Sequence, residues 1–173
     1  WVKLLNSGQT CIAPDYVLAE RPIADELVAK IIENVERFRA AEAKTSQRII
    51  NDRQFDRLSG LIGSTTGKVL MGGGADRATL RMEPTVIVDP AADDPVMTEE
   101  IFGPILPMVR VGSTDAAIRY INAKPKPLAL YVFTESASQA RRVIDAVPSG
   151  GAVVNHIAMH VMVPQLPFGG VGP

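Results

Sequence analysis

The sequence of 173 residues has one cysteine, two histidines and no long hydrophobic run. A single cysteine cannot form an internal disulfide and cannot by itself build a zinc site. No apolar stretch approaches the roughly 20 residues that a membrane-spanning helix needs, and no signal peptide is visible. These absences lead us to expect a cytoplasmic protein without a membrane segment in this chain.

An excess of charge of either sign is also lacking. The chain has 18 Lys and Arg against 19 Asp and Glu, which gives a formal net charge of −1. This balance offers no electrostatic reason to expect nucleic acid or an anionic membrane as a partner. The 46% apolar and 21% charged residues are typical of a soluble globular protein.

The length fits one domain with a sizeable core, which we expect over residues 1–173. The chain opens on "WVKLL", a helix-like stretch without a start Met, and stops inside a glycine-rich run, "LPFGGVGP". We therefore expect a fragment, truncated at both ends.

Hydrophobic periodicity predicts an α/β fold. Apolar stripes and polar caps predict helices over residues 25–43, 51–64, 113–124 and 136–147. Short apolar runs predict strands over residues 68–71, 84–89, 105–111, 128–134 and 150–155, the third interrupted by Pro107. A loop is expected over 89–95. This alternation predicts a mostly parallel twisted sheet with helices on both faces.

Cys11 lies in "LLNSGQTCIAPDYVLAE", between a helix-like and a strand-like stretch. Gly8 permits a bend just before it, so we expect a connection that presents the side chain to a cleft. Two interpretations remain open: a buried cysteine that behaves as a small hydrophobe, or a nucleophile whose thiolate form is favoured by its surroundings. The polar, glycine-bearing neighbours favour the nucleophile.

His156 and His160 are the obvious residues to activate such a thiol. Their i, i+4 spacing resembles metal-ligand spacing on a helix, but the following "VMVP" argues against a helix. No HExxH motif is present and no third ligand is evident. We predict no metal site and two structural histidines.

Two further stretches could carry chemistry. In "MTEEIFGPILPM", Glu99 and Glu100 precede Phe102. This is either a solvated acidic turn or a carboxylate–aromatic pair that binds ribose hydroxyls and packs on a ring. "LPFGGVGP" has neither a GxGxxG nor a phosphate-loop pattern. Its glycines form either a flexible turn or a place where the backbone passes close to another element.

Together, "NSGQTC", "EEIFGP" and "LPFGGVG" resemble, in order and in separation, three motifs of the NAD(P)-dependent aldehyde dehydrogenases. "CIAPDYVL", "RIINDRQFDRLSGLI", "KPLALYVF" and "PQLPFGGVGP" are most similar to the class 3 branch, which includes fatty, aromatic and coniferyl aldehyde enzymes. The resemblance covers essentially the whole chain, as the family's catalytic domain. It implies an aldehyde substrate, NAD or NADP as cofactor and a homodimeric parent protein.

The resemblance implies a role for each matching residue. Cys11 matches the nucleophile that forms a thiohemiacetal and, after hydride transfer to the nicotinamide, a thioester that water hydrolyses. Its backbone N–H matches one oxyanion-hole donor. Asn6 and Gln9 match positions that shape the cysteine loop. Glu100 matches the carboxylate on the nicotinamide-side ribose, and Phe102 the aromatic beside it.

The resemblance also implies what the chain lacks. The general-base glutamate, the oxyanion-hole asparagine and the adenine-side cofactor domain lie before the cysteine, and the oligomerisation tail follows the chain's end. We therefore expect the isolated chain to be inactive. Two alternatives stay open: an acylating relative that passes the thioester to coenzyme A, and a non-catalytic structural relative. His156 stands where class 3 relatives tend to have an acidic residue, which bears on substrate preference.

Overall fold

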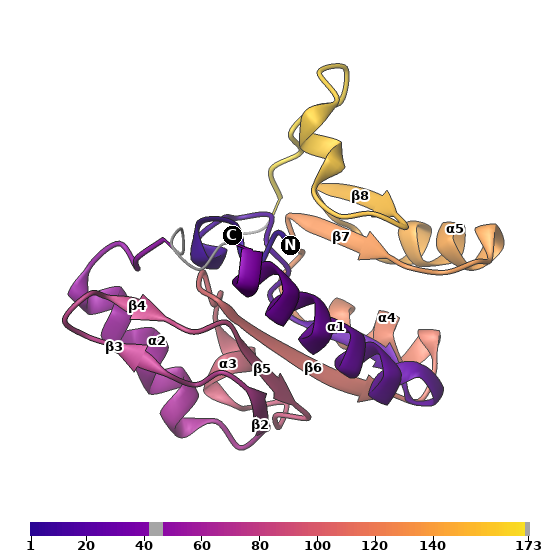
Figure 1. The fold of residues 1–173 in the computed structure, drawn as a ribbon. Helices are drawn as coiled ribbons and strands as arrows, with labels where there is room; N and C mark the ends of the chain where they lie inside the picture. The colour runs from indigo at the N-terminus through magenta and orange to yellow at the C-terminus, as the bar shows by residue number, and fades with distance from the viewer. Residues whose placement is uncertain (42–46, 172–173) are drawn as a thin grey trace. The chain divides into compact units, whose positions relative to one another are not determined.

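The computed structural model describes residues 1–41 and 47–171 (Figure 1). The described chain forms two compact units, Trp1–Arg110 and Val111–Pro173. The elements of the first unit are η1 (Leu5–Gly8), β1 (Val17–Glu20), α1 (Arg21–Ala41), α2 (Asp52–Ser64), β2 (Lys68–Met71), β3 (Ala75–Asp76), β4 (Arg81–Met82), β5 (Thr85–Val88), α3 (Pro95–Thr98) and β6 (Ile105–Val111). Those of the second are α4 (Thr114–Asn122), β7 (Ala129–Val132), α5 (Ala137–Ala146), β8 (Gly151–Val154) and η2 (Met159–Met162).

A four-stranded sheet in the order β1-β6-β5-β2 organises the first unit (Figure 1). Strands β5 and β6 are parallel, with Val88 opposite Met108. Strand β2 adds an antiparallel edge, and its pairing with β5 shifts register between Val69 and Met71. The predicted α/β fold is confirmed, although the antiparallel edge strand was not anticipated.

Both faces of this sheet are covered. On one face, Ala24 and Val28 of α1 pack with Val88 and Met108 in a buried cluster. Side chains alternate between the faces along a strand, so Ile87 points to the opposite side. There, a Cβ added at Gly67, which follows α2, would lie 2.5 Å from a methyl group of Ile87.

Strand β6 runs through Pro107 without the predicted interruption. The Thr85 N–H donates to the Pro104 carbonyl and the Asp89 N–H to the Met108 carbonyl. Even-numbered positions of β6 therefore bond to β5, because alternate residues of a strand face alternate neighbours. The N–H that Pro107 lacks would point away from β5, so that ladder stays intact.

Local caps explain where the helices begin. The Asn51 side chain accepts a hydrogen bond from the Gln54 N–H and caps α2. Helix α1 begins at Arg21 and not at Asp25, because Pro22 fits the first turn, where its missing N–H has no partner to lose. Of its predicted C-terminal end, residues 42 and 43 lie outside the described residues.

Two stretches were assigned wrongly. "WVKLL" is not an α-helix; it forms a turn that leads into the short η1. The predicted loop over 89–95 ends in α3, whose N-terminus Asp94 caps by accepting from the Val96 N–H at 2.9 Å.

The second unit is built on the parallel pair β7 and β8, with Leu130 opposite Ala152. Its core consists of Leu130, Val132, Ala140, Val143 and Val147, with Ile118 and Ile121 of α4 packed against it. Strand β7 alternates between half-buried and buried residues and β8 is mostly half-buried. Neither strand is therefore fully buried on both sides.

Candidate functional site

The cysteine loop begins with a left-handed turn. Asn6, Ser7 and Gly8 have φ angles of 51°, 54° and 71°. A left-handed backbone conformation is costly for residues other than glycine, so we expect side-chain hydrogen bonds that stabilise it. The Asn6 side-chain amide donates to the Gln9 carbonyl at 3.0 Å, and the Gln9 amide donates to the Asn6 carbonyl at 2.9 Å. The two amides close the turn that precedes Cys11.

The same loop is tied to the segment 47–50. The Gln9 side chain donates to the Arg48 carbonyl at 3.1 Å and accepts from the Ile50 N–H at 2.9 Å. The Ser7 hydroxyl donates to the Gln47 carbonyl. These bonds engage both ends of the Gln9 amide, which makes it a structural part of the loop.

Cys11 itself is exposed on a tight turn, in which the Ala13 N–H donates to the Thr10 carbonyl at 2.9 Å. The buried-cysteine interpretation is therefore wrong. An exposed thiol on a turn that is fixed by hydrogen bonds is accessible to a small electrophile.

Gly8 brings the cysteine loop against the second motif. A Cβ added at Gly8 would lie 2.2 Å from the Gly103 carbonyl oxygen and 3.1 Å from that of Lys3. Gly103 in turn packs under Leu58 of α2, whose side chain would lie 2.5 Å from an added Cβ. The structure thus places "NSGQTC" directly on "EEIFGP".

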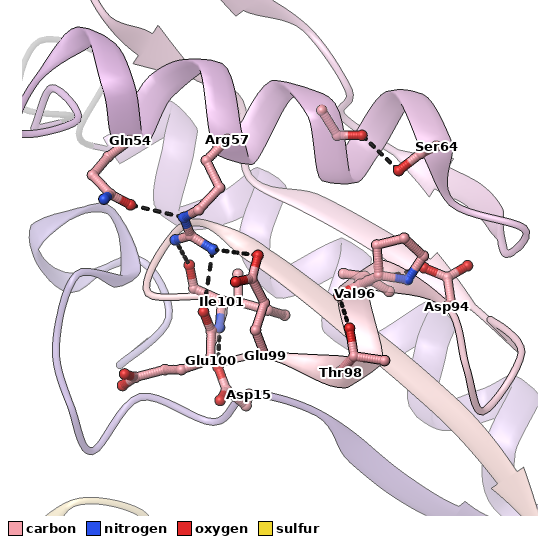
Figure 2. A network of polar contacts seen from close by, with 12 residues as sticks. Asp15, Gln54, Arg57, Ser64, Asp94, Val96, Thr98, Glu99, Glu100 and Ile101 are labelled. Atoms are coloured by element: carbon pink, nitrogen blue, oxygen red, sulfur yellow. Dashed lines mark hydrogen bonds and ion pairs between the residues drawn. The ribbon is translucent and has the colours of Figure 1, made fainter.

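Arg57 of α2 holds the backbone of this second motif (Figure 2). Its guanidinium donates to the Glu100 carbonyl at 3.2 Å and to the Ile101 carbonyl at 2.5 Å. It also binds the Glu99 carboxylate at 3.2 Å and the Gln54 side chain at 2.7 Å. Arg57 is not among the residues predicted from the sequence, where its one local signal is the Gln54–Arg57 spacing of three residues on a helix.

The side chains of Glu99 and Glu100 consequently have different contacts. Glu99 directs its carboxylate to Arg57, whereas the Glu100 carboxylate points away from the guanidinium (Figure 2). Among the described residues, the Glu100 carboxylate has no hydrogen bond. Burial and the nearby Asp15 charge raise its pKa above the ordinary value, against the opposing charges of Lys3 and Arg57.

Lys3 and Asp15 lie beneath this segment, and sequence analysis missed both. Lys3 is buried, and its ammonium nitrogen, which has no hydrogen bond within the described part of the chain, lies 3.9 Å from Asp15 Oδ1. Asp15 Oδ1 also accepts from the Ile101 N–H at 3.1 Å. Burial lowers the pKa of Lys3 to about 8, although Asp15 and Glu100 oppose the shift. Burial likewise raises the pKa of Asp15.

Phe102 follows with a left-handed φ of 47° and a side chain that is 39% exposed. It lines a hollow of about 310 Å³ together with Asn6, Gln9, Gln47, Arg48 and Ile50. Three of the predicted site residues, Asn6, Gln9 and Phe102, therefore share one hollow in the first unit.

The remaining candidates lie in the second unit. His156 accepts at Nδ1 from the Ile157 N–H at 2.9 Å. His160 lies in η2, where no helix was predicted, and its ring would be 2.6 Å from a Cβ added at Gly151. Within residues 1–41 and 47–171, no group of three His, Cys, Asp or Glu side chains could hold a metal ion.

The late glycine-rich motif marks a close backbone approach. Gly169 has a φ of 70°, and a Cβ there would lie 1.9 Å from the Gly150 carbonyl oxygen. Of the two interpretations of "LPFGGVGP", the close approach is the correct one at Gly169. Gly172 lies outside the described residues.

None of the helices in the described part of the chain has the length and apolar character needed to cross a membrane.

Comparison with known proteins gives concordant matches. The model of the aldehyde dehydrogenase family matches residues 1–173. Over 175 aligned residues, the chain is 46% identical to the rat (Rattus norvegicus) dimeric NADP-preferring aldehyde dehydrogenase, covering 99% of the chain and 38% of that protein. It is 48% identical to mouse (Mus musculus) aldehyde dehydrogenase family 3 member A2, covering 99% of the chain and 36% of that protein.

A solved structure agrees with these relatives. The substrate-bound AldH of Staphylococcus aureus superposes with a TM-score of 0.92 at 39% identity, covering 98% of this chain and 38% of that one. The chain thus spans a little over a third of the length of the proteins it matches. Because the family model matches the whole sequence, the chain belongs to the aldehyde dehydrogenase family.

Proposed function

We propose that the protein that carries this chain oxidises an aldehyde to the carboxylic acid, with Cys11 as nucleophile and NAD or NADP as oxidant. One observation carries the proposal: the loop of the exposed Cys11 packs through Gly8 on Gly103, beside Glu100 and Phe102. The cysteine loop is thereby packed against the segment that carries Glu100 and Phe102, a carboxylate and an aromatic ring of the kinds that bind a nucleoside. The relative named as NADP-preferring supports the choice of cofactor class.

The residues present fit the nicotinamide half of such a cofactor. The exposed Glu100 carboxylate carries no hydrogen bond within the described residues, so both its oxygens can accept from ribose hydroxyls. The exposed Phe102 ring offers an apolar face beside it. Arg57 and Asp15 fix the backbone between them, so that these two side chains start from a defined position. When bound, the nicotinamide supplies the two-electron acceptor for the oxidation.

The chain's own chemistry centres on Cys11. Its thiolate adds to the aldehyde carbon, which forms a C–S bond and leaves the negative charge on the former carbonyl oxygen. A backbone N–H directed at that oxygen stabilises the charge as it develops. Oxidation of this thiohemiacetal gives a thioester on Cys11. Water then cleaves the C–S bond, which releases the acid and restores the thiol.

Several finer features belong to the same proposal. The substrate is an aromatic aldehyde, such as coniferyl aldehyde, or an aliphatic one. The parent protein is a homodimer, in keeping with a relative that is named dimeric. The general base lies outside these 173 residues, so the isolated chain does not turn over aldehydes, which the partial coverage of the relatives supports.

The test is formation of NADH or NADPH, followed by absorbance, from benzaldehyde, coniferyl aldehyde and hexanal. The protein that carries the chain should reduce the cofactor, and Cys11→Ser should abolish the reaction without changing the melting temperature. Addition of coenzyme A should leave the product a free acid; an acyl-CoA product would identify an acylating enzyme instead. Unchanged activity of Cys11→Ser would contradict the assignment of the nucleophile.

A second measurement separates a catalytic from a structural protein. Iodoacetamide should alkylate Cys11 faster than it alkylates free cysteine at neutral pH, because a nucleophilic site favours the thiolate. Alkylation at the rate of free cysteine or more slowly would favour a non-catalytic relative of the same fold.

A further inference from the structure

We infer that Lys3 is a positioning residue for Glu100. The enclosed ammonium group of Lys3 keeps the carboxylates of Asp15 and Glu100 charged and in place to receive a ribose. The inference rests on the proposed function, because it assumes that Glu100 holds the cofactor. It extends that function to a residue that never touches substrate or cofactor.

The burial of Lys3 requires an explanation. The residue is 8% exposed, and among residues 1–41 and 47–171 its ammonium nitrogen finds no hydrogen-bond partner. Lysine is rarely fully buried unless it is paired, and a buried ammonium without hydrogen bonds is costly. Surface lysines of this chain behave differently: Lys30 binds Glu33 at 3.0 Å in solvent. Lys3 therefore occupies a position where an apolar side chain would fold at lower cost.

The acidic neighbours of Lys3 connect it to the segment of Glu100 and Ile101, which the proposed function places beside the cofactor. Its nitrogen lies 3.9 Å from Asp15 Oδ1, and that same oxygen accepts from the Ile101 N–H at 3.1 Å. Asp15 thus bridges Lys3 to the residue that follows Glu100. The charged groups that act on Lys3 are Asp15 and Glu100, both negative. Arg57 acts on both carboxylates, but its guanidinium is already engaged by Glu99 and by backbone carbonyls.

The electrostatic cost of the cluster indicates that stability does not explain it. Burial lowers the pKa of Lys3 and raises the pKa values of Asp15 and Glu100. Each shift favours the neutral form, so the fold penalises all three charges. A charge cluster that stabilised the fold would shift each pKa in the opposite direction. Clusters that cost stability are typical of functional sites.

Removal of the ammonium would leave Arg57, which is already engaged elsewhere, as the positive charge that still acts on both Asp15 and Glu100. The two carboxylates would then repel each other with less compensation, so the pKa of Glu100 rises further or its side chain turns toward solvent. Either outcome weakens an acceptor of ribose hydroxyls. The same loss occurs in the unaltered protein when Lys3 releases its proton, which happens as the pH rises through about 8.

The experiment compares Lys3→Met, Lys3→Arg and the surface control Lys30→Met in the protein that carries the chain. Binding of NADPH and NADH is measured by fluorescence titration from neutral to alkaline pH, together with the melting temperature of each variant. Lys3→Met should bind the reduced cofactors about tenfold more weakly near neutral pH, Lys3→Arg should recover most of the affinity, and Lys30→Met should match the unaltered protein.

The pH profile distinguishes positioning from a structural role. Affinity of the unaltered protein should fall as the pH rises through about 8, and Lys3→Met should show no such fall. Equal affinity and equal profiles in the two proteins would overturn the inference, as would a lowered melting temperature with unchanged affinity. If Lys3→Met fails to fold, a flat profile in the unaltered protein suffices to overturn it. Absence of binding by the unaltered protein contradicts the proposed function itself.

Discussion

Gly8 and Gly103 touch through their backbones, and that contact joins the two sequence motifs of the first unit. The Cβ that any other residue would place at position 8 would lie 2.2 Å from the Gly103 carbonyl oxygen. The distance between the cysteine loop and the segment that contains Gly103 is therefore set by two residues without side chains.

Gly8→Ala should destabilise the protein by about 1–3 kcal/mol, because alanine is strained in a left-handed backbone conformation and its methyl group would overlap Gly103. The displaced loop should also change the rate at which iodoacetamide alkylates Cys11. Urea unfolding and the alkylation rate are the measurements. The control is Gly60→Ala in α2, where nothing lies within 4 Å of an added Cβ; it should stabilise by about 0.5–1 kcal/mol. Equal effects at both positions would disprove the close contact.

Arg57→Met should weaken NADPH binding about tenfold, since the Glu100 and Ile101 carbonyls lose their donor and the segment loosens. Fluorescence titration measures the affinity. Arg53→Met serves as control, because Arg53 is an exposed arginine of the same helix. If Arg57→Met binds the cofactor as tightly as Arg53→Met, the guanidinium does not position Glu100.

Lys3 should give stability a distinctive pH dependence. Its folded pKa of about 8 lies below the ordinary value of 10.5, so between these values the unfolded chain binds more protons than the folded one. Stability from this group therefore rises with pH in that window, and the burial penalty is complete below about 8. Urea unfolding at several pH values measures the free energy of unfolding of the unaltered protein and of Lys3→Met. As the pH rises above about 8, the unaltered protein should gain stability relative to Lys3→Met. A constant difference would show that Lys3 titrates normally.

Gly169→Ala should destabilise the second unit, because Gly169 has a φ of 70° and an added Cβ would meet the Gly150 carbonyl oxygen at 1.9 Å. About 1–3 kcal/mol is expected from the strained backbone alone. Gly170→Ala is the matched neighbour, with nothing within 4 Å of its added Cβ, and should be close to neutral. Thermal unfolding of the two variants measures the contrast; a similar loss for both would refute the close approach.

Local sequence patterns were sufficient to predict the position of most helices and strands. Three of the predicted helices are capped at the first residue of their predicted range, Asn51, Ser113 and Ser136, because each cap depends only on its own hydrogen bond to a residue three positions on. Helix α1 begins four residues before the predicted start, and α3 lies where the loop over 89–95 was predicted to end; Pro22 and Pro95 both fit the first turn of a helix. The predicted interruption at Pro107 is wrong, because the missing N–H of a proline affects only one side of a strand, and the sequence does not show which side faces β5.

The sequence by itself determined the α/β class, the helix caps and the family, because periodicity, capping and motifs are local properties that survive without knowledge of the fold. It also singled out Cys11, Glu100 and Phe102, whose catalytic and binding roles remain predictions. Only the tertiary structure decided that Cys11 is exposed, that Gly8 lies on Gly103, and that Glu99 serves Arg57 while Glu100 does not. It alone brought Lys3 and Asp15 together with the segment that follows Glu100. Such contacts join residues tens of positions apart, and burial and charge act through space, so no local pattern specifies them.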